Sequence, residues 1–200
     1  MIAASDVTGL VLAGGLGRRM SEDGNGLDKG LVALRGRPMV AHVIERLAPQ
    51  VGPLLINANR HADAYRAFGP PVVADDIEGF AGPLAGLHAG LRAAGTPFVA
   101  TVPCDAPLLP ADLVARLAGA FDAAGADVAV ARTGAQPHPV FLLVRRSLLP
   151  HLEAFLATGR RRVDAWYASL RVAEVDFGDA APFVNINTRA ELERLEQDPS

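Results

Sequence analysis

The chain has 200 residues and a net charge of −3, and 50% of its residues are hydrophobic while 20% are charged, which is typical of one globular domain and excludes an intrinsically disordered chain. The acidic balance argues against general nucleic-acid binding, and the single cysteine, Cys104, excludes both an intrachain disulfide and a cysteine-rich zinc site. No apolar run approaches the roughly 20 residues that span a bilayer, and no signal peptide is evident, so we expect a cytoplasmic protein without a membrane partner.

Strand-like and helix-like segments alternate along the chain. Short apolar runs that end at glycine or polar residues predict strands, and apolar residues at helical spacing predict helices. The expected strands are 7–13, 53–58, 70–75, 97–102, 126–131, 138–146 and 171–177. The expected helices are 38–50, 62–68, 83–95, 110–125, 147–159 and 188–197. Thr188 followed by Glu191 is a capping-box signature for the last helix.

This alternation predicts an α/β fold, a sandwich built round a mainly parallel sheet. The sequence shows neither a repeat nor a linker, so residues 1–200 are predicted to form a single domain, with residues 1–6 and 197–200 as loose termini. In such sheets, ligands bind outside the carboxyl ends of the strands. Gly14, Asn57, Asp75 and Asp105 each follow or close a predicted strand, which places them at that edge.

The segment VLAGGLGRRM, residues 11–20, predicts a glycine-rich turn after the first strand. A dinucleotide fingerprint fails because Met20 stands where the third glycine is required, and a Walker A loop fails because Lys29 is followed by Gly30. Exposed backbone N–H groups beside Arg19 and Lys29 can still cradle an anion. The alternative is a loop that uses glycine for positive φ and carries solvated arginines.

A wider set of motifs resembles one enzyme family. VLAGGLGRRM, LDKG, INANRH, GPLAG, VPCDAP, HPVFLLV, RRRV and VNINT occur in the order seen in the molybdenum cofactor guanylyltransferases, from about Thr8 to about Leu195. The glycine-arginine-lysine element alone is shared with sugar-nucleotide pyrophosphorylases and cytidylyltransferases, whereas the other motifs are more specific. The resemblance implies a nucleotidyltransferase with a glycosyltransferase-A-like, Rossmann-type three-layer fold.

The resemblance also implies a reaction, in which GTP and molybdenum-bearing molybdopterin give molybdenum-molybdopterin guanine dinucleotide and pyrophosphate, with Mg²⁺ required. The phosphate of molybdopterin is the nucleophile, and it is substantially ionised near neutral pH if its second pKa is about 6. No side-chain nucleophile is therefore needed. Other cofactor-synthesis proteins and recipient molybdoenzymes are the further partners that this function implies.

The family motifs assign roles to individual residues. Asp105, Lys29 and Arg19 are expected to be catalytic, with Asp105 as the Mg²⁺ ligand. The expected GTP-binding residues are Leu12, Ala13, Gly14, Gly15, Lys29, Asn57, Asp75, Gly82 and Asp105. The expected molybdopterin-binding residues are Asn185, Asn187 and Arg162.

Each role has a local structural alternative. Asp105 can instead form an Asx turn before Pro107, Asn185 and Asn187 can cap the following helix, and Arg162 can belong to a solvated face. Their neighbours are expected to be structural: Asn59 as a left-handed turn residue, Asp76 as a helix cap, Cys104 and Trp166 as core residues, and His138 as a turn residue.

Three other functions remain open from the sequence. A molybdopterin cytidylyltransferase and a sugar-1-phosphate nucleotidyltransferase are rivals with the same fold, and a non-catalytic nucleotide-binding module is a rival of another class. The chain departs from the family pattern at SEDGNGL, residues 21–27, where the family has a very short link. We expect this insertion to act as a lid over the bound phosphates.

Overall fold

The computed structural model describes residues 1–13, 16–17, 27–77 and 82–197, which pack round one seven-stranded sheet. The strand order is β11-β9-β10-β8-β1-β6-β7. The strands are β1 (Val7–Leu12), β6 (Leu54–Asn57), β7 (Val72–Val73), β8 (Phe98–Pro103), β9 (Val128–Thr133), β10 (Gln136–Arg145) and β11 (Val172–Asp176). β10 is antiparallel to both of its neighbours and every other pair is parallel. The predicted mainly parallel sheet is confirmed.

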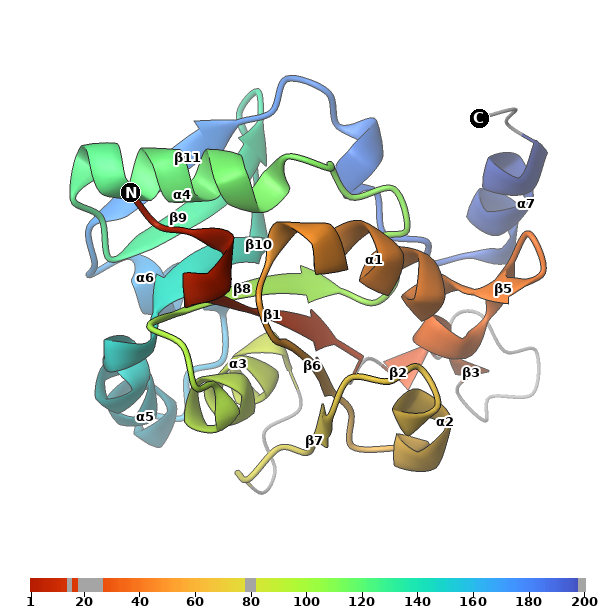
Figure 1. Ribbon diagram of the computed structural model, residues 1–200, viewed down its shortest axis with the longest axis horizontal. Helices are drawn as coiled ribbons and strands as arrows, with labels where there is room; N and C mark the ends of the chain where they lie inside the picture. Colours follow the sequence, from red (N-terminus) through yellow and green to blue (C-terminus); the bar gives the residue numbers. More distant parts are fainter. Residues whose placement is uncertain (14–15, 18–26, 78–81, 198–200) are drawn as a thin grey trace.

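Helices cover both faces of the sheet, which gives the expected three layers (Figure 1). α1 (Met39–Leu47) and α4 (Leu113–Ala124) contribute to one hydrophobic core, whereas α3 (Pro83–Ala93), α5 (Leu149–Ala157) and α6 (Val163–Tyr167) contribute to the other. Trp166 is completely buried in the second core, as expected from the sequence.

The remaining elements lie outside these layers. α2 (Ala62–Arg66) follows β6, and α7 (Arg189–Gln197) closes the described chain. Two small antiparallel pairs join β2 (Leu16–Gly17) to β3 (Leu27–Asp28) and β4 (Ala33–Leu34) to β5 (Arg37–Pro38). Short 3₁₀ turns occupy Ala4–Asp6, Lys29–Leu31, Ala48–Gln50, Arg146–Leu148 and Ala181–Phe183. The four strands of these two antiparallel pairs and α6 were not predicted, because they are short segments without a clear periodicity.

The N-terminal residues make polar contacts with α4. The backbone N–H of Ile2 donates to Asp122 Oδ2 at 2.9 Å, and the terminal amine lies 3.5 Å from the same oxygen. These contacts hold the first residues against α4, where Figure 1 places the N-terminus. Gln197 is the last residue of α7, and residues 198–200 lie outside the described part of the chain.

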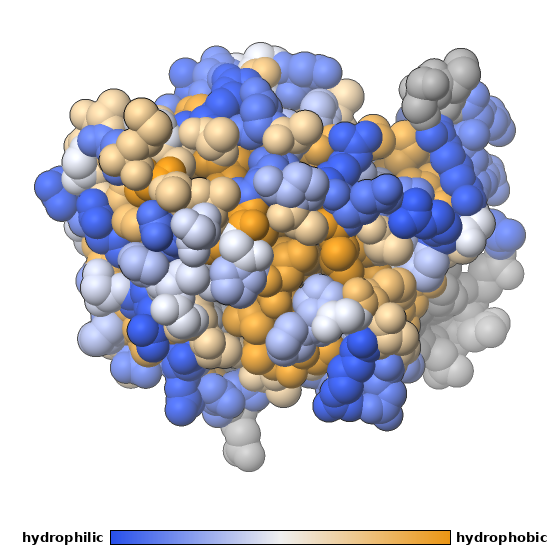
Figure 2. Space-filling model, in the orientation of Figure 1, coloured by the Kyte–Doolittle hydropathy of each residue, from blue (hydrophilic) through white to orange (hydrophobic). Residues whose placement is uncertain are grey.

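One face of the molecule carries both hydrophobic and hydrophilic residues. Figure 2 shows hydrophobic residues gathered in the middle of the face and hydrophilic residues around them. Among the described residues, no helix combines the length and the apolarity needed to cross a membrane.

Candidate active site

Three predicted site residues meet beyond the carboxyl end of β8. Lys29 Nζ lies 3.3 Å from Asp105 Oδ2 and also donates a hydrogen bond to Asn187 Oδ1. The side chains of Lys29 and Asp105 are mostly buried, with 17% and 10% of their surface exposed. The ammonium group of Lys29 therefore contacts two residues that lie 76 and 158 positions further along the sequence.

The chain trace fixes Asp105 at this point. Cys104 follows β8, and its N–H donates to the carbonyl of Leu12, so the sheet ladder extends one residue past the strand. Asp105 then turns away from the sheet, and its own carbonyl accepts from Ile186 N–H at 2.9 Å. Burial raises the pKa of the Asp105 carboxyl above 3.8, and the charge and hydrogen bond of Lys29 counteract that rise. Asp105 is thus a nearly buried carboxylate that depends on a cation.

Asn187 is held by the helix that follows it. Glu191 Oε2 accepts from the backbone N–H groups of Asn187 and Thr188, and Thr188 Oγ1 accepts from Glu191 N–H at 3.2 Å. The predicted capping box is confirmed, and it leaves the Asn187 side chain free of a capping duty. That side chain contacts Lys29 and donates to the carbonyl of Asn185.

A second polar cluster follows β6 and β7. Asn57 Nδ2 donates to Asp75 Oδ1 at 2.8 Å, and Asn59 Nδ2 donates to Asp75 Oδ2 at 2.7 Å. Asn59 also accepts from Asp75 N–H at 2.7 Å. The carboxylate of Asp75 therefore accepts hydrogen bonds from two side-chain amides, which fix its orientation at the ligand-binding edge of the sheet.

The close approach of α3 fixes Asn57 in turn. A Cβ added at Gly86 would lie only 2.3 Å from Asn57 Oδ1 and 2.7 Å from a methyl of Leu12. Gly82 precedes the first turn of α3 with φ 154°, and Pro83 occupies that turn. Glycine at 86 thus lets the helix reach the strand end, and glycine at 82 permits the entry into the helix.

Several predicted site residues lie outside the described part of the chain or stand apart from these two clusters. Gly14, Gly15, Arg19 and most of the insertion at 21–27 lie outside the described residues. Arg162 is exposed and pairs with Asp164 at the start of α6, with 2.5 Å between Nη2 and Oδ2. Among the described residues, the hydrogen bonds and the ion pair of Arg162 reach Asp164 and do not extend to Lys29, Asp105 or Asn187.

Some of the roles predicted from the sequence for neighbours of the site are wrong. Asn59 was expected to be a turn residue and instead holds Asp75, and Asp76 pairs with Arg92 at 2.9 Å instead of capping a helix. His138 lies in β10 and stacks on Phe183 at 4.7 Å, so it is not a turn residue. Cys104 is buried, as expected. Only the spacing of asparagines 57 and 59 after a strand hinted at a shared role.

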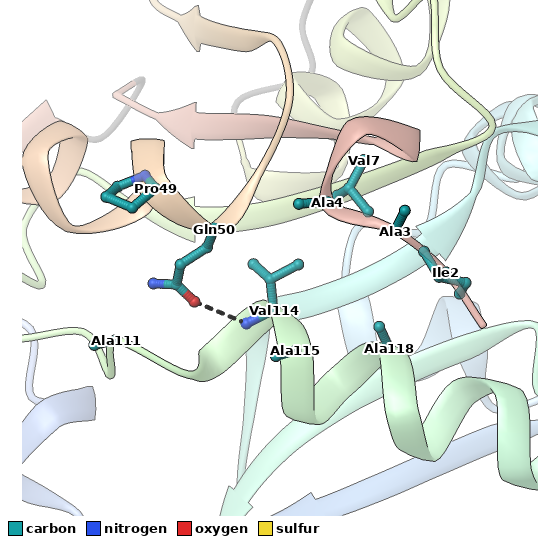
Figure 3. A pocket seen from close by; sticks show the side chains of 10 residues that line it. All are labelled: Ile2, Ala3, Ala4, Val7, Pro49, Gln50, Ala111, Val114, Ala115 and Ala118. Carbon is teal, nitrogen blue, oxygen red and sulfur yellow. Dashed lines mark hydrogen bonds between the residues drawn. The ribbon is translucent and has the colours of Figure 1, made fainter.

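A hollow of about 250 Å³ lies elsewhere in the molecule (Figure 3). Val7, the first residue of β1, contributes to its lining, whereas the polar clusters follow the last residues of the parallel strands. Its lining side chains are apolar except that of Gln50, whose Oε1 accepts from Val114 N–H at 3.0 Å. The hollow is therefore at the opposite edge of the sheet and offers no charged group for a nucleotide.

The sequence and the fold both have counterparts among known proteins. The model of the MobA-like NTP transferase domain matches residues 9–173. A protein from Cupriavidus necator, named molybdenum cofactor guanylyltransferase, is 54% identical over 96% of this chain and 97% of its own. The chain belongs to this family. A second member, from Bordetella petrii, is 52% identical over 98% of this chain and 100% of its own.

Membership of the molybdenum cofactor guanylyltransferase family makes the chain a nucleotidyltransferase. The crystal structure of molybdopterin-guanine dinucleotide biosynthesis protein A from Archaeoglobus fulgidus has the same fold. Its TM-score is 0.76 at 24% identity, with 95% of this chain and 97% of that chain covered. The predicted fold class and enzyme class are both confirmed.

Proposed function

We propose that this nucleotidyltransferase moves GMP from GTP to molybdenum-bearing molybdopterin. An oxygen of the molybdopterin phosphate attacks the α-phosphorus of GTP, a new P–O–P bridge forms, and the bond to the β-phosphate bridging oxygen breaks. Pyrophosphate leaves with that electron pair. The protein has to align two anions and to neutralise charge, so the observation that carries the proposal is the convergence of Lys29, Asp105 and Asn187.

Lys29 is proposed to bind the triphosphate. It is the only lysine in the sequence, and its ammonium is held between two oxygen acceptors. An ammonium is a compact charge suited to phosphate oxygens, and the nearly buried setting strengthens its attraction because the surroundings screen it less than water does. Arg19 is proposed as a second phosphate cation, by its place in the RRM motif.

Asp105 is proposed to hold Mg²⁺, and the residues around it fit that ion. Two hard oxygen atoms, from Asp105 and Asn187, already converge on one positive group. Among the described residues, no cluster of three or more His, Cys, Asp or Glu is present. This suits Mg²⁺, which often takes one or two carboxylates and completes its shell with water and phosphate. The bound ion would supply neutralisation of the phosphate charge that develops in the transition state.

The guanosine is proposed to lie against the Asn57–Asp75 cluster. Asp75 can accept from guanine N–H groups or ribose hydroxyls because each of its oxygens accepts more than one hydrogen bond. Asn57 and Asn59 keep the carboxylate aimed by their two amide donors. We propose that the segment after β1 also contacts the nucleotide, through Leu12, Ala13, Gly14 and Gly15. Gly82 brings the N-terminus of α3 to the same edge of the sheet.

The molybdopterin is proposed to lie on the side of Asn185 and Asn187, with Arg162 on its phosphate. Asn185 Oδ1 is buried and accepts no hydrogen bond from the residues that the structure describes. A buried acceptor without a donor is costly, and a donor on the pterin would relieve that cost. We also propose that the reaction takes place in the cytoplasm, with other cofactor-synthesis proteins and recipient molybdoenzymes as the partners of its product.

The single lysine makes the phosphate assignment testable. Guanosine diphosphopyridoxal carries an aldehyde at the end of its phosphate chain, where the aldehyde forms a Schiff base with a nearby amine, and borohydride fixes it. We expect labelling of Lys29, protection by excess GTP with Mg²⁺, and no protection by CTP. Labelling confined to the amine of Met1 would contradict the placement of GTP beside Lys29.

A further inference from the structure

Tyr65 lies directly beneath the segment that carries Lys29. It comes from α2, its side chain is completely buried, and its hydroxyl donates a hydrogen bond to Asp28 Oδ1. Asp28 is the residue immediately before Lys29. The contact therefore joins a helix that follows the guanosine-side strand β6 to the lysine of the phosphate side.

The residue after Lys29 rests on the same hydroxyl. A Cβ added at Gly30 would lie 2.5 Å from Tyr65 Oη and 3.1 Å from Cys104 Sγ. Cys104 is buried and precedes Asp105. The backbone on both sides of Lys29 is thus seated, by a hydrogen bond at Asp28 and by van der Waals contact at Gly30.

The ring and the hydroxyl of Tyr65 have different surroundings. The ring packs in the core, with Phe68 at 6.4 Å between centroids. The hydroxyl faces Asp28, and burial, together with the neighbouring anionic groups, raises the pKa of Tyr65 far above its ordinary value. The hydroxyl consequently keeps its proton and remains a donor. A phenylalanine would satisfy the core equally well, so packing alone does not account for the hydroxyl.

We propose that Tyr65 is a positioning residue, whose hydroxyl fixes Asp28 and thereby sets where the ammonium of Lys29 lies between Asp105 and Asn187. The catalytic consequence rests on the proposed function, in which Lys29 binds the triphosphate. A displacement of about 1 Å in a catalytic group can reduce a rate by about 100-fold. Loss of this one hydroxyl therefore acts on turnover through Lys29.

The test compares Tyr65→Phe with Tyr167→Phe, the same change at the other tyrosine of the chain, which lies in α6 on the other face of the sheet. Protein labelled with ¹³C at the ε-carbon of lysine gives one side-chain NMR signal, because Lys29 is the only lysine. We expect Tyr65→Phe to shift or broaden that signal and to lower kcat/KM for GTP by about 10- to 100-fold. Tyr167→Phe should leave both unchanged.

The two readouts separate this inference from the proposed function. An unchanged Lys29 signal in Tyr65→Phe overturns the positioning role, whatever the kinetics. A changed signal with parental kinetics upholds the positioning of Lys29 and contradicts its proposed part in the reaction. Asp28→Ala removes the acceptor without touching the core, and the double variant should be no slower than the slower single variant, because both changes break one contact. Additive losses would overturn the inference.

Discussion

Lys29 Nζ lies 3.3 Å from Asp105 Oδ2, and this pair joins the 3₁₀ turn Lys29–Leu31 to the segment that follows β8. Both side chains are mostly buried, so each depends on the other for charge compensation. Asn187 accepts from the same ammonium and brings in the segment before α7. The first predictions follow from this three-residue contact.

Asp105→Asn should keep the fold and lose most of the turnover. The amide has nearly the shape of the carboxylate, but it is a poor ligand for Mg²⁺ and leaves phosphate charge uncompensated. We expect turnover to fall by about 100-fold or more. Steady-state kinetics over a range of Mg²⁺ concentrations checks this, with the exposed Asp63→Asn as the control. Near-parental rates at ordinary Mg²⁺ concentrations would refute the metal assignment.

Substitutions at the neighbouring residues Asn187 and Thr188 should have different effects, the first on activity and the second on stability. Asn187→Ala removes an acceptor of Lys29 but keeps the backbone N–H that Glu191 accepts, so we expect activity to fall by about 10-fold or more with little loss of stability. Thr188→Ala removes the cap of α7 and should cost about 1 kcal/mol of unfolding free energy with activity retained. Kinetics and urea unfolding of both variants would separate the roles. Equal effects on both properties would contradict the division.

Gly86→Ala should disturb the guanosine side. The new methyl would meet Asn57 Oδ1 at 2.3 Å, so we expect a loss of about 1–3 kcal/mol in unfolding free energy and a raised KM for GTP. Gly119→Ala is the matched control, because this glycine also lies inside a helix but its Cβ position is open within 4 Å. That control should gain up to about 1 kcal/mol. A Gly86→Ala protein with parental KM and stability would show that Asn57 is free to move aside.

The ion pair between Asp127 and Arg171 should make the stability of the fold depend on pH. Arg171 donates to it from Nε at 3.1 Å and Nη2 at 3.0 Å, and these bonds hold the pKa of Asp127 below its ordinary value of 3.8. A lowered pKa gives stability that is present above the ordinary value and is lost as the pH falls through the folded value. The effect should be small because water screens the exposed guanidinium of Arg171.

Urea unfolding of the parent and Asp127→Asn at several pH values checks this pair. The free energy of unfolding should be larger for the parent than for the variant at pH 7. This difference should shrink as the pH falls below about 4. A difference that is constant or that grows in acid would mean that the ion pair does not stabilise the fold.

The sequence predicted the layers well because periodicity and glycine signals are local. It also predicted which residues reach the ligand-binding edge, since parallel strands end there. It did not predict that Asn59 and Asp75 bind each other, because that contact depends on how two strand ends splay in space. Nor did it predict Tyr65 beneath Asp28, since an apolar pattern does not distinguish a tyrosine that packs from one that also donates.

The direction of β10 could have been predicted. Only a short link with Gly134 at φ 55° separates β9 from β10, and a parallel crossover needs a dozen or more residues. The 3₁₀ turn that carries Lys29 could not have been predicted, because it is a short segment fixed by contacts with Tyr65 and Cys104. Local signals therefore account for the scaffold, and tertiary contacts account for the fine geometry of the site.

The most direct test of the proposed reaction is nucleotide-dependent pyrophosphate release in the presence of molybdenum-bearing molybdopterin, compared for GTP, CTP and ATP. The account predicts release with GTP that requires both molybdopterin and Mg²⁺, together with formation of the guanine dinucleotide product, and little release with CTP or ATP. Release with CTP equal to or above that with GTP would contradict guanylyl transfer and would make the chain a cytidylyltransferase of the same fold.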